Sequence, residues 1–198
     1  MELKDIIAKR RMVRRYAPDP VSDDVLNRIL WAGRRAPSAG FSQGLDHVVL
    51  RGRDQLEPLW KVILPPDYVE PQLREGPTVV ILPIPDVQAY LDRYSLPDKA
   101  AAGKQTAESW PVHYWDLDAA MSVMLMLLSA EDEGLGGVFT GIFANEREML
   151  DSLGVPPNRR PIGLLGLGYV HSEGPGNPGS AKVIPKRKPS EVIHWGRW

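Results

Sequence analysis

The pattern of apolar and polar residues predicts a mixture of helices and short strands. Leu3, Ile6 and Ile7 lie on one helical face, which predicts a short amphipathic helix that ends near the following arginines. A second helix is expected from about Asp23 to Arg35, because Ser22 is a good N-cap and two aspartates follow it at the positive end of the helix. Each helix has one apolar face, so each should pack against a core.

Short β-branched runs bounded by glycine or proline are typical of buried strands. Two such runs extend from His47 to Arg51 and from Thr78 to Ile84, and a helical stretch around Leu56 to Val62 separates them. Two later runs, from about Gly137 to Phe143 and from Pro161 to Val170, predict the remaining core strands. Because helices and strands are mixed without strict alternation, an α+β fold with a mainly antiparallel or mixed sheet is favoured over a doubly wound fold.

A helix beginning near Asp116 is apolar nearly all round and should therefore lie at the centre of the molecule. Its apolar stretch, from Leu117 to Ala130, is shorter than the ~20 residues needed to cross a bilayer, so it predicts a buried helix and no membrane span. Met121, Met124 and Met126 are interpreted as core filler, because flexible thioether side chains fill irregular gaps.

Single residues predict the ends of two helices. Gly134 should stop the apolar helix, and Gly154 should cap the C-terminus of the helix that follows. At the start of that following helix, Asn145 and Glu148 have the spacing of a capping box.

Two segments differ from the rest in composition. Residues 85–115 are rich in charged and aromatic side chains and are interrupted by proline and glycine, which predicts irregular helices outside the core and the most mobile part of the chain. Residues 171–198 are rich in glycine, proline and basic residues and end on Ile193, Trp195 and Trp198. Large apolar groups need a surface to cover, so this C-terminal tail should dock on another surface.

Composition narrows the classes of function. A chain of 198 residues, of which 43% are hydrophobic, suits one compact domain. Its 24 Lys and Arg residues are balanced by 25 Asp and Glu residues, which argues against a nucleic-acid-binding or membrane-surface protein. There are no cysteines, so any redox chemistry must use a bound cofactor. The N-terminus lacks the residue order of a signal peptide, and a cytoplasmic location is the default expectation.

Two basic clusters are candidates for binding an anion. Arg10, Arg11, Arg14 and Arg15 lie close together at the end of a helix and could grip a phosphate through bidentate hydrogen bonds. The cluster Lys186-Arg187-Lys188 in the tail could meet the same anion. Taken alone, the arginines at the helix end are more often a solvated basic face.

The loop from Pro37 to Gln43 is a candidate for contact with a planar ligand. Its small residues let a backbone approach closely, and Ser38, Ser42 and Gln43 can bond the polar edge of a ring. From composition alone, an ordinary loop after a helix is the favoured interpretation. The glycines at 134–141 do not form a dinucleotide fingerprint, because Phe139 occupies the place of the third glycine. The histidines show no metal-ligand spacing, and no metal site is predicted.

Taken in order along the chain, these segments resemble the FMN-dependent nitroreductase family. The matching pieces are the arginine-rich turn at 10–16, the Pro18 to Val21 lead-in, A-P-S-A-G-F-S-Q at 36–43, G-L-G-G-V-F-T-G at 134–141, G-L-G-Y-V at 166–170 and the tail at 186–193. No single piece is specific, but the ordered set spans nearly the whole chain. The resemblance implies a single nitroreductase-like domain over residues 1–198, with a central sheet flanked by helices in three layers.

The resemblance also implies an intertwined homodimer with two FMN sites at its interface, in which the tail reaches across the partner subunit. The residues that it assigns to FMN are Arg10, Arg11, Met12 and Arg14 near the phosphate and ring, Pro37, Ser38, Ala39 and Gln43 along the ring, Thr140 and Gly141 near the N5 edge, and Arg187 at the phosphate. The implied chemistry is ping-pong hydride transfer through flavin N5, from NADH or NADPH to a small flat acceptor such as a nitroaromatic or quinone. No catalytic side chain is expected, because the flavin does the electron chemistry.

This sequence departs from the family pattern at two places in the loop. Phe41 stands where the family usually has asparagine, and Gly44 where it usually has proline, so one polar contact to FMN is absent and the loop is looser. Phe41 could instead line the acceptor pocket. Trp110 and Tyr114 are candidates for stacking on a substrate, although core or interface packing explains aromatic residues there at least as well.

Two alternative functions remain open at this point. The same fold could carry another flavin reaction, such as dehydrogenation or reductive dehalogenation. The chain could also be a non-catalytic protein that binds or stores a flavin.

Overall fold

The computed structural model describes all 198 residues of the chain. In chain order its elements are α1 (Leu3–Lys9), α2 (Asp23–Gly33), η1 (Ala39–Phe41), β1 (Leu45–Arg51), α3 (Gly52–Ile63), α4 (Pro66–Glu75), β2 (Val79–Pro85), α5 (Val87–Ser95), η2 (Ala100–Ala102), η3 (Ala107–Ser109), α6 (Tyr114–Asp132), β3 (Gly136–Thr140), α7 (Glu146–Ser152), β4 (Leu164–Gly168), η4 (Gly179–Lys182) and η5 (Pro189–Glu191), where η denotes a short 3-10 helix. None of the helices is both long enough and apolar enough to span a membrane.

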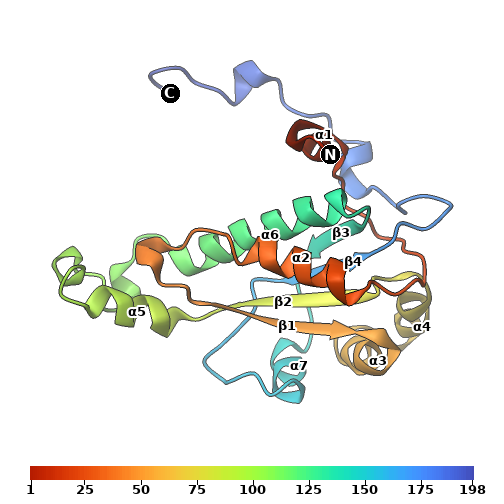
Figure 1. The fold of residues 1–198 in the computed structure, drawn as a ribbon, viewed down its shortest axis with the longest axis horizontal. Helices are drawn as coiled ribbons and strands as arrows, with labels where there is room; N and C mark the ends of the chain where they lie inside the picture. Colours follow the sequence, from red (N-terminus) through yellow and green to blue (C-terminus); the bar gives the residue numbers. More distant parts are fainter.

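The strands form one sheet in the order β1-β2-β4-β3, and every neighbouring pair is antiparallel. Helices α2 and α6 cover one face of the sheet, and α3, α4 and α7 lie on the other side (Figure 1). The expected α+β fold, with three layers around a mainly antiparallel sheet, is therefore confirmed.

Strand β2 is the centre of the fold, because all of its residues are buried. Val79 and Ile81 pack into one hydrophobic cluster with residues of α2 and α6. Val80 and Leu82 pack into a second cluster with residues of α3 and α7. A strand that is buried on both faces has no polar side, which explains why its sequence is a continuous apolar run.

Helices α2 and α6 approach each other closely where α2 ends. A Cβ atom placed on Gly33 would lie 2.7 Å from Cγ of Met126, so the backbone of α2 packs directly against α6. At the other end of α2, the hydroxyl of Ser22 accepts a hydrogen bond from the amide of Val25, which confirms the predicted N-cap. The helix ends at Gly33, slightly before the predicted Arg35.

One side of α6 is not covered by the rest of the chain. Met126 is fully buried, but Leu117, Met121 and Met124 are 45%, 39% and 44% exposed. The interpretation of Met121 and Met124 as core filler is therefore wrong for the single chain, because the sheet and α2 cover only the opposite side of the helix.

The predicted helix ends differ in their outcome. Gly134 and Gly154 follow α6 and α7 with left-handed φ values of 78° and 70°, which confirms both as stop residues. The capping box at the start of α7 is wrong. Asn145 is itself left-handed, with φ of 51°, and its side-chain amide donates a hydrogen bond to the carbonyl of Val62 at 2.7 Å instead of capping the helix.

Two further elements differ from the predicted ranges. Helix α4 is not predicted, because it contains Pro66 and Pro71 and buries only Val69, so its sequence shows little helical pattern. Strand β3 ends at Thr140, whereas the prediction extends to Phe143, whose ring is 91% exposed.

The C-terminal tail runs away from the body of the molecule. After passing α1 it extends outward as an irregular chain with short 3-10 turns (Figure 1). Trp195 and Trp198 are 89% and 100% exposed. The surface on which these rings are expected to dock is therefore not supplied by their own chain.

Replacing Leu165 with alanine should lower the free energy of unfolding by about 2–5 kcal/mol, because this side chain is fully buried in the cluster between the sheet, α2 and α6. Leu96, which is 50% exposed, offers the matched control, and Leu96→Ala should change the same free energy by about 0.5 kcal/mol or less. Urea denaturation followed by circular dichroism measures both. Equal losses would contradict this assignment of the core.

Candidate functional site

The arginine-rich segment between α1 and α2 is extended and lies beside β3. Met12 forms a parallel bridge with Gly137, and the amide of Val13 donates a hydrogen bond to the carbonyl of Gly137 at 2.9 Å. A Cβ atom on the adjacent Gly136 would lie 2.5 Å from the side chain of Val13. Gly136 thus lets the segment pack directly on the strand, which fixes its side chains relative to the sheet.

Tyr16 anchors the end of this segment. Its ring is fully buried, and its hydroxyl donates a hydrogen bond to the carbonyl of Val13 at 2.6 Å. Burial raises the pKa of Tyr16 well above its ordinary value, so the phenol keeps the proton that it donates.

Three arginines of the segment have no carboxylate partner. Arg10, Arg11 and Arg14 form no ion pair in the chain, whereas Arg15 is held by two glutamates at 2.8 and 2.5 Å. Nη1 of Arg10 is buried and has no hydrogen-bond partner. A buried guanidinium nitrogen is costly without an acceptor, so this arrangement fits a phosphate group that would supply one.

The loop of residues 37–43 has an unusual backbone. Gly40, Phe41 and Gln43 have positive φ values of 63°, 58° and 52°. Glycine adopts this region readily, but other residues do so at a cost of about 1 kcal/mol or more, and asparagine tolerates it better than phenylalanine. Contacts with the rest of the molecule must therefore hold the loop in this shape.

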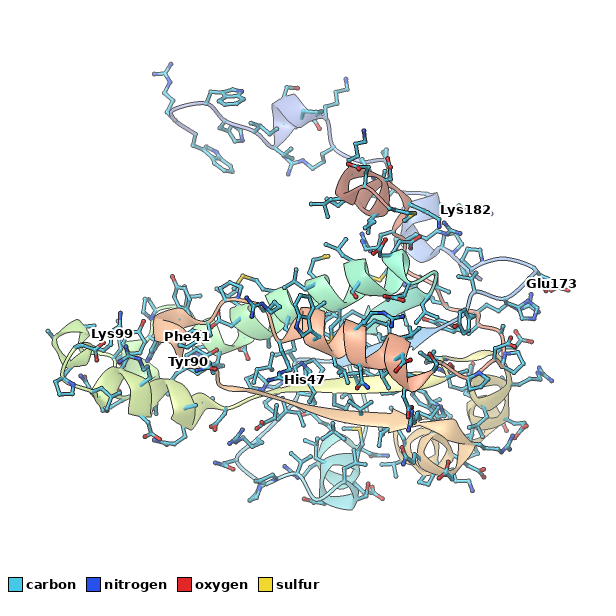
Figure 2. The ribbon with its side chains drawn as sticks, viewed as in Figure 1. Phe41, His47, Tyr90, Lys99, Glu173 and Lys182 are labelled. Atoms are coloured by element: carbon cyan, nitrogen blue, oxygen red, sulfur yellow. The ribbon has the colours of Figure 1, made fainter.

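Asp118 of α6 is the principal anchor of the loop. Its side chain is buried, and its Oδ2 accepts hydrogen bonds from the amide of Ala39 at 2.8 Å and from the hydroxyl of Tyr90 at 2.7 Å. Burial, followed by the hydrogen bond to Asp118, raises the pKa of Tyr90, so its hydroxyl remains a donor. Figure 2 shows Phe41 and Tyr90 close to each other at this end of the molecule. Asp118 therefore ties the loop to both α6 and α5.

Further hydrogen bonds brace the same loop. Arg93 of α5 donates through Nε to the carbonyl of Gly40 at 2.7 Å. Ser38 accepts from the amide of Gln43 at 3.0 Å, and the hydroxyl of Ser42 donates to a carbonyl within the loop at 2.6 Å. The serine hydroxyls expected at the edge of a ligand thus take part in holding the loop, although Ser38 keeps its own proton to donate.

In one chain the arginine segment and the loop lie at opposite ends of α6. Lys9, just before the segment, pairs with Glu131 at 3.3 Å, whereas the loop bonds Asp118 near the start of the helix. The rise of an α-helix puts these two positions roughly 20 Å apart. The uncovered flank of α6 joins residues 37–39 in an open, largely apolar pocket of about 610 Å³.

Thr140 and Gly141 lie at the exposed end of β3. The same strand bonds the arginine segment through Gly137, three residues earlier and roughly 10 Å away. The structure therefore brings these two predicted regions together on one element of one chain.

The aromatic candidates have different environments. Trp110 is only 6% exposed, and the rings of four other aromatic side chains pack against it. The structure thus gives Trp110 a packing role and corrects its assignment as a substrate-stacking residue. Tyr114 is 43% exposed and borders the same apolar pocket as the loop, where it is accessible to a ligand.

Arg187 is not joined to the arginine segment in the single chain. Its guanidinium donates to the carbonyl of Glu191 within the tail, while Arg14 reaches the carbonyl of Asn177 at 3.3 Å. That Arg187 and Arg10 bind one anion together remains a prediction.

Sequence reasoning missed Asp118 and Arg93. Their partners in the loop lie 79 and 53 positions away, too far for a local pattern to connect them. One signal existed for Asp118, because it is an ionisable residue in an otherwise apolar stretch of helix.

Comparisons with known proteins agree with this fold. A model of the Nitroreductase family matches residues 7–169. An NADH dehydrogenase of Thermus thermophilus is 31% identical over 195 residues, which cover 88% of this chain and 89% of that protein. An Archaeoglobus fulgidus protein named NADH dehydrogenase/NAD(P)H nitroreductase is 26% identical over 100% of this chain and 99% of its own length. A nitroreductase from Desulfovibrio desulfuricans, solved in complex with FMN, is 25% identical with a TM-score of 0.70 and covers 98% of this chain and 95% of its own.

Replacing Asp118 with alanine should loosen the loop, because the amide of Ala39 and the hydroxyl of Tyr90 would both lose their acceptor. Each buried unpaired donor costs about 1–3 kcal/mol, so the free energy of unfolding should fall by about 2–6 kcal/mol. Hydrogen exchange at residues 38–43 should become faster. Tyr90→Phe, which removes only one of the two bonds, is the control and should leave exchange at Ala39 nearly unchanged; equal acceleration in both variants would contradict the anchoring role.

Replacing Phe41 with asparagine should raise the free energy of unfolding by about 1 kcal/mol, because Phe41 has φ of 58° and its ring is 73% exposed, so little packing is lost. Phe143→Asn is the matched control, since Phe143 is also exposed but does not have a positive φ. Thermal denaturation measures both variants. A destabilised Phe41→Asn would show that the ring is held by contacts stronger than the backbone strain.

Proposed function

Because the chain belongs to the nitroreductase family, we propose that it is an FMN-dependent oxidoreductase that takes hydride from NADH or NADPH and reduces small, flat, electron-poor acceptors such as nitroaromatics and quinones. The observation that carries the proposal is the arginine segment fixed on β3, in which Nη1 of Arg10 is buried without a partner. The relative solved with FMN supports the choice of cofactor.

The residues of this chain fit specific parts of FMN. Arg10 and Arg14 would bond the phosphate, because neither has a carboxylate partner of its own. The backbone around Met12 and Thr140 would face the ring, because both residues lie along β3. FMN supplies the redox chemistry when it is bound, which is why the chain needs to bind and orient ligands rather than offer a catalytic side chain.

We infer that a second copy of the chain completes each site. The loop at 37–43 and the arginine segment are roughly 20 Å apart along α6 in one chain, and the flank of the helix between them carries the exposed Leu117, Met121 and Met124. Two copies that pair their α6 flanks in opposite directions would bury these side chains. A two-fold pairing of this kind would also bring the loop of each copy toward the arginine segment of the other.

In such a dimer the exposed tail would find its surface on the partner. Trp195 and Trp198 are fully or almost fully exposed in one chain, and burial of such rings is strongly favourable. Arg187 would then add a third guanidinium to the phosphate. Phe41 and Tyr114 would line the space over the ring, where a flat acceptor can stack.

The proposed reaction is tested with purified protein, FMN and NADPH or NADH under anaerobic conditions. The flavin absorption should bleach with the nicotinamide and return when a nitroaromatic or quinone is added. Bleaching without return would favour another flavin reaction on the same fold. A protein that binds FMN but is not bleached would favour a binding or storage role, and a protein that never binds FMN would contradict all three functions.

Replacing Arg10 and Arg187 together with alanine should weaken FMN binding at least about 100-fold, because hydrogen bonds to a charged group contribute about 1.5–3 kcal/mol each. Quenching of FMN fluorescence gives the dissociation constant. Arg160→Ala is the control, since that side chain is 80% exposed and lies outside the proposed site, and it should leave FMN affinity unchanged. A double variant that keeps stoichiometric FMN would rule out the arginine clamp.

A further inference from the structure

A second pocket, which we call the loop pocket, is formed by the loop of residues 37–43 together with the end of α2, the start of β1 and α5. Its volume of about 580 Å³ is typical of small-molecule sites. It shares Pro37, Ser38 and Asp118 with the apolar pocket beside α6. The two pockets are therefore neighbours, separated by one short stretch of the loop.

Two arginines that line the loop pocket have no carboxylate partner. Arg34 and Arg35 directly follow α2, and their guanidinium groups form no ion pair or hydrogen bond within the chain. The guanidinium of Arg35 lies over the ring of Trp31, 5.9 Å from its centroid, and a contact of this kind uses no N–H donor. Both arginines thus keep their donors for a ligand.

The lining of the loop pocket has an excess of positive charge. Its only acidic residue is Asp118, whose Oδ2 already accepts hydrogen bonds from the amide of Ala39 and the hydroxyl of Tyr90. Asp46 on β1 lies outside the lining and is paired with Arg159 at 3.0 Å. A pocket lined mainly by one sign of charge concentrates ligands of the opposite sign, so the loop pocket should attract anions.

His47 lines the same pocket without adding to its charge. Burial is the main cause that lowers the pKa of His47; Asp46 opposes this effect, and the positive charge of Arg34 adds to it. The imidazole is therefore neutral at neutral pH, and its Nε2 lies 3.4 Å from Oγ of Ser122. The influence of Arg34 on His47 shows that the two side chains are close, so the ring can report on a ligand bound at Arg34.

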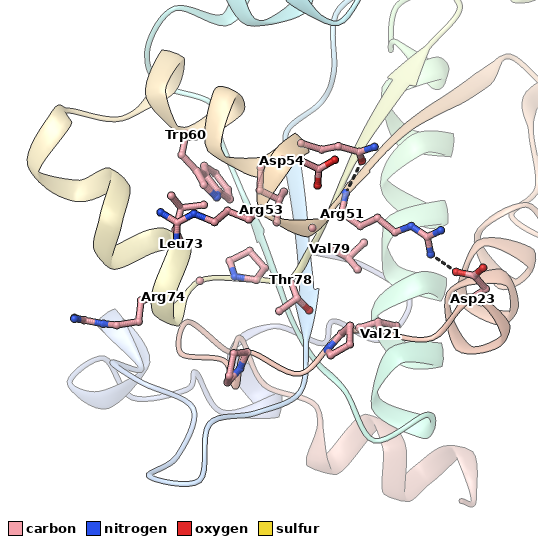
Figure 3. Close-up of a pocket in the computed structure, with 17 residues that line it drawn as sticks. Val21, Asp23, Arg51, Arg53, Asp54, Trp60, Leu73, Arg74, Thr78 and Val79 are labelled. Carbon is pink, nitrogen blue, oxygen red and sulfur yellow. Dashed lines mark hydrogen bonds and ion pairs between the residues drawn. The ribbon is translucent and has the colours of Figure 1, made fainter.

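The pocket between α3, α4 and the turn leading into α2 differs in this respect (Figure 3). Arg51 is paired with Asp23 there, as the dashed line in Figure 3 marks. The other two arginines of its lining, Arg53 and Arg74, lie 2.8 and 3.6 Å from a glutamate. Because paired guanidinium groups attract a further anion less, an anionic ligand is expected in the loop pocket and not in this one.

A phosphate monoester has the charge and the shape that two adjacent arginines bind well. It carries about −1.5 to −2 charges at pH 7 and three acceptor oxygens, which planar guanidinium groups can bond in pairs. The loop pocket is larger than one phosphate group, so the phosphate should belong to a larger molecule. NADPH is such a molecule, because its nicotinamide end gives the hydride and its adenosine end carries a 2′-phosphate that NADH lacks.

We propose that the loop pocket binds the 2′-phosphate of NADPH through Arg34 and Arg35, so that the enzyme selects NADPH over NADH. Arginine side chains are a common means of accommodating this phosphate. The nicotinamide ring lies on the other side of the loop, in the apolar pocket beside α6 where the flavin is proposed to bind. The inference rests on the proposed function, because only hydride transfer to the flavin requires a nicotinamide there.

The first experiment compares the two nicotinamides on the FMN-loaded, full-length protein by stopped-flow bleaching of the flavin under anaerobic conditions. The concentration dependence of bleaching gives a dissociation constant and a limiting rate for each donor. NADPH should bind at least about tenfold more tightly than NADH, because hydrogen bonds to a charged group contribute about 1.5–3 kcal/mol each.

Arg34→Gln and Arg35→Gln should each weaken NADPH binding about tenfold, because each removes one guanidinium from the phosphate. The limiting rate of bleaching should change by about twofold or less, because these side chains touch only the distant end of the donor. Arg160→Gln is the control, since that side chain is 80% exposed and lies outside the loop pocket. It should leave the affinity for both nicotinamides unchanged.

The second experiment locates the phosphate without hydride transfer. The protein is titrated with adenosine 2′,5′-bisphosphate and observed through the NMR signals of the histidine rings. The chain has four histidines, and the signal that disappears in His47→Gln identifies His47. This signal should shift in a saturable way with the bisphosphate, and at least about tenfold more bisphosphate should be needed in Arg34→Gln. Adenosine 5′-monophosphate and inorganic phosphate should shift it only weakly.

The possible failures are distinguishable. Equal affinity for NADPH and NADH, unchanged in Arg34→Gln and Arg35→Gln, would overturn the proposal and leave the proposed function intact. Flavin that neither nicotinamide bleaches would contradict the proposed function and this inference with it. An equally strong shift of His47 with inorganic phosphate would show a general anion pocket and overturn the assignment to NADPH.

Discussion

The structure depends on how the apolar circumference of α6 is buried. The sheet and α2 cover one side of this helix through Val123, Met126 and Leu127, while the opposite flank faces solvent in the single chain. Burial of apolar surface is the main favourable contribution to folding and to association. Because the candidate cofactor segments lie at the two ends of the uncovered flank, the helix that organises the core also sets the spacing of the site.

The arginine segment shows how one short stretch can serve both structure and binding. Val13 and Tyr16 are buried and fix the stretch to the sheet, and the salt bridges of Arg15 hold its far end. Arg10 and Arg14 are left without carboxylate partners. Contacts with α4 and the tail decide which of these arginines are paired with a carboxylate. The sequence does not show these contacts, since all four guanidinium groups look alike in the pattern Arg-Arg-Met-Val-Arg-Arg.

Elements whose pattern reflects burial could be predicted from the sequence, and those held by distant contacts could not. Strand β2 and helix α2 follow from apolar runs and the Ser22 cap, because local residues decide them. Helix α4 has little apolar pattern and two prolines, and Asn145 bonds a carbonyl on another helix, so local reasoning fails at both. In the candidate site the order of motifs indicates which segments take part, but the role of Asp118 depends on a contact across 79 positions.

The hydrogen bonds that hold residues 37–43 also affect the thermodynamics of binding. A loop with three left-handed residues, held by Asp118 and Arg93, gives up its conformational entropy when the chain folds. A ligand that packs against it then has little ordering left to impose, and more of the contact energy appears as affinity. Substitutions in α5 that never touch a ligand should therefore alter its affinity, because they return disorder to the unbound loop.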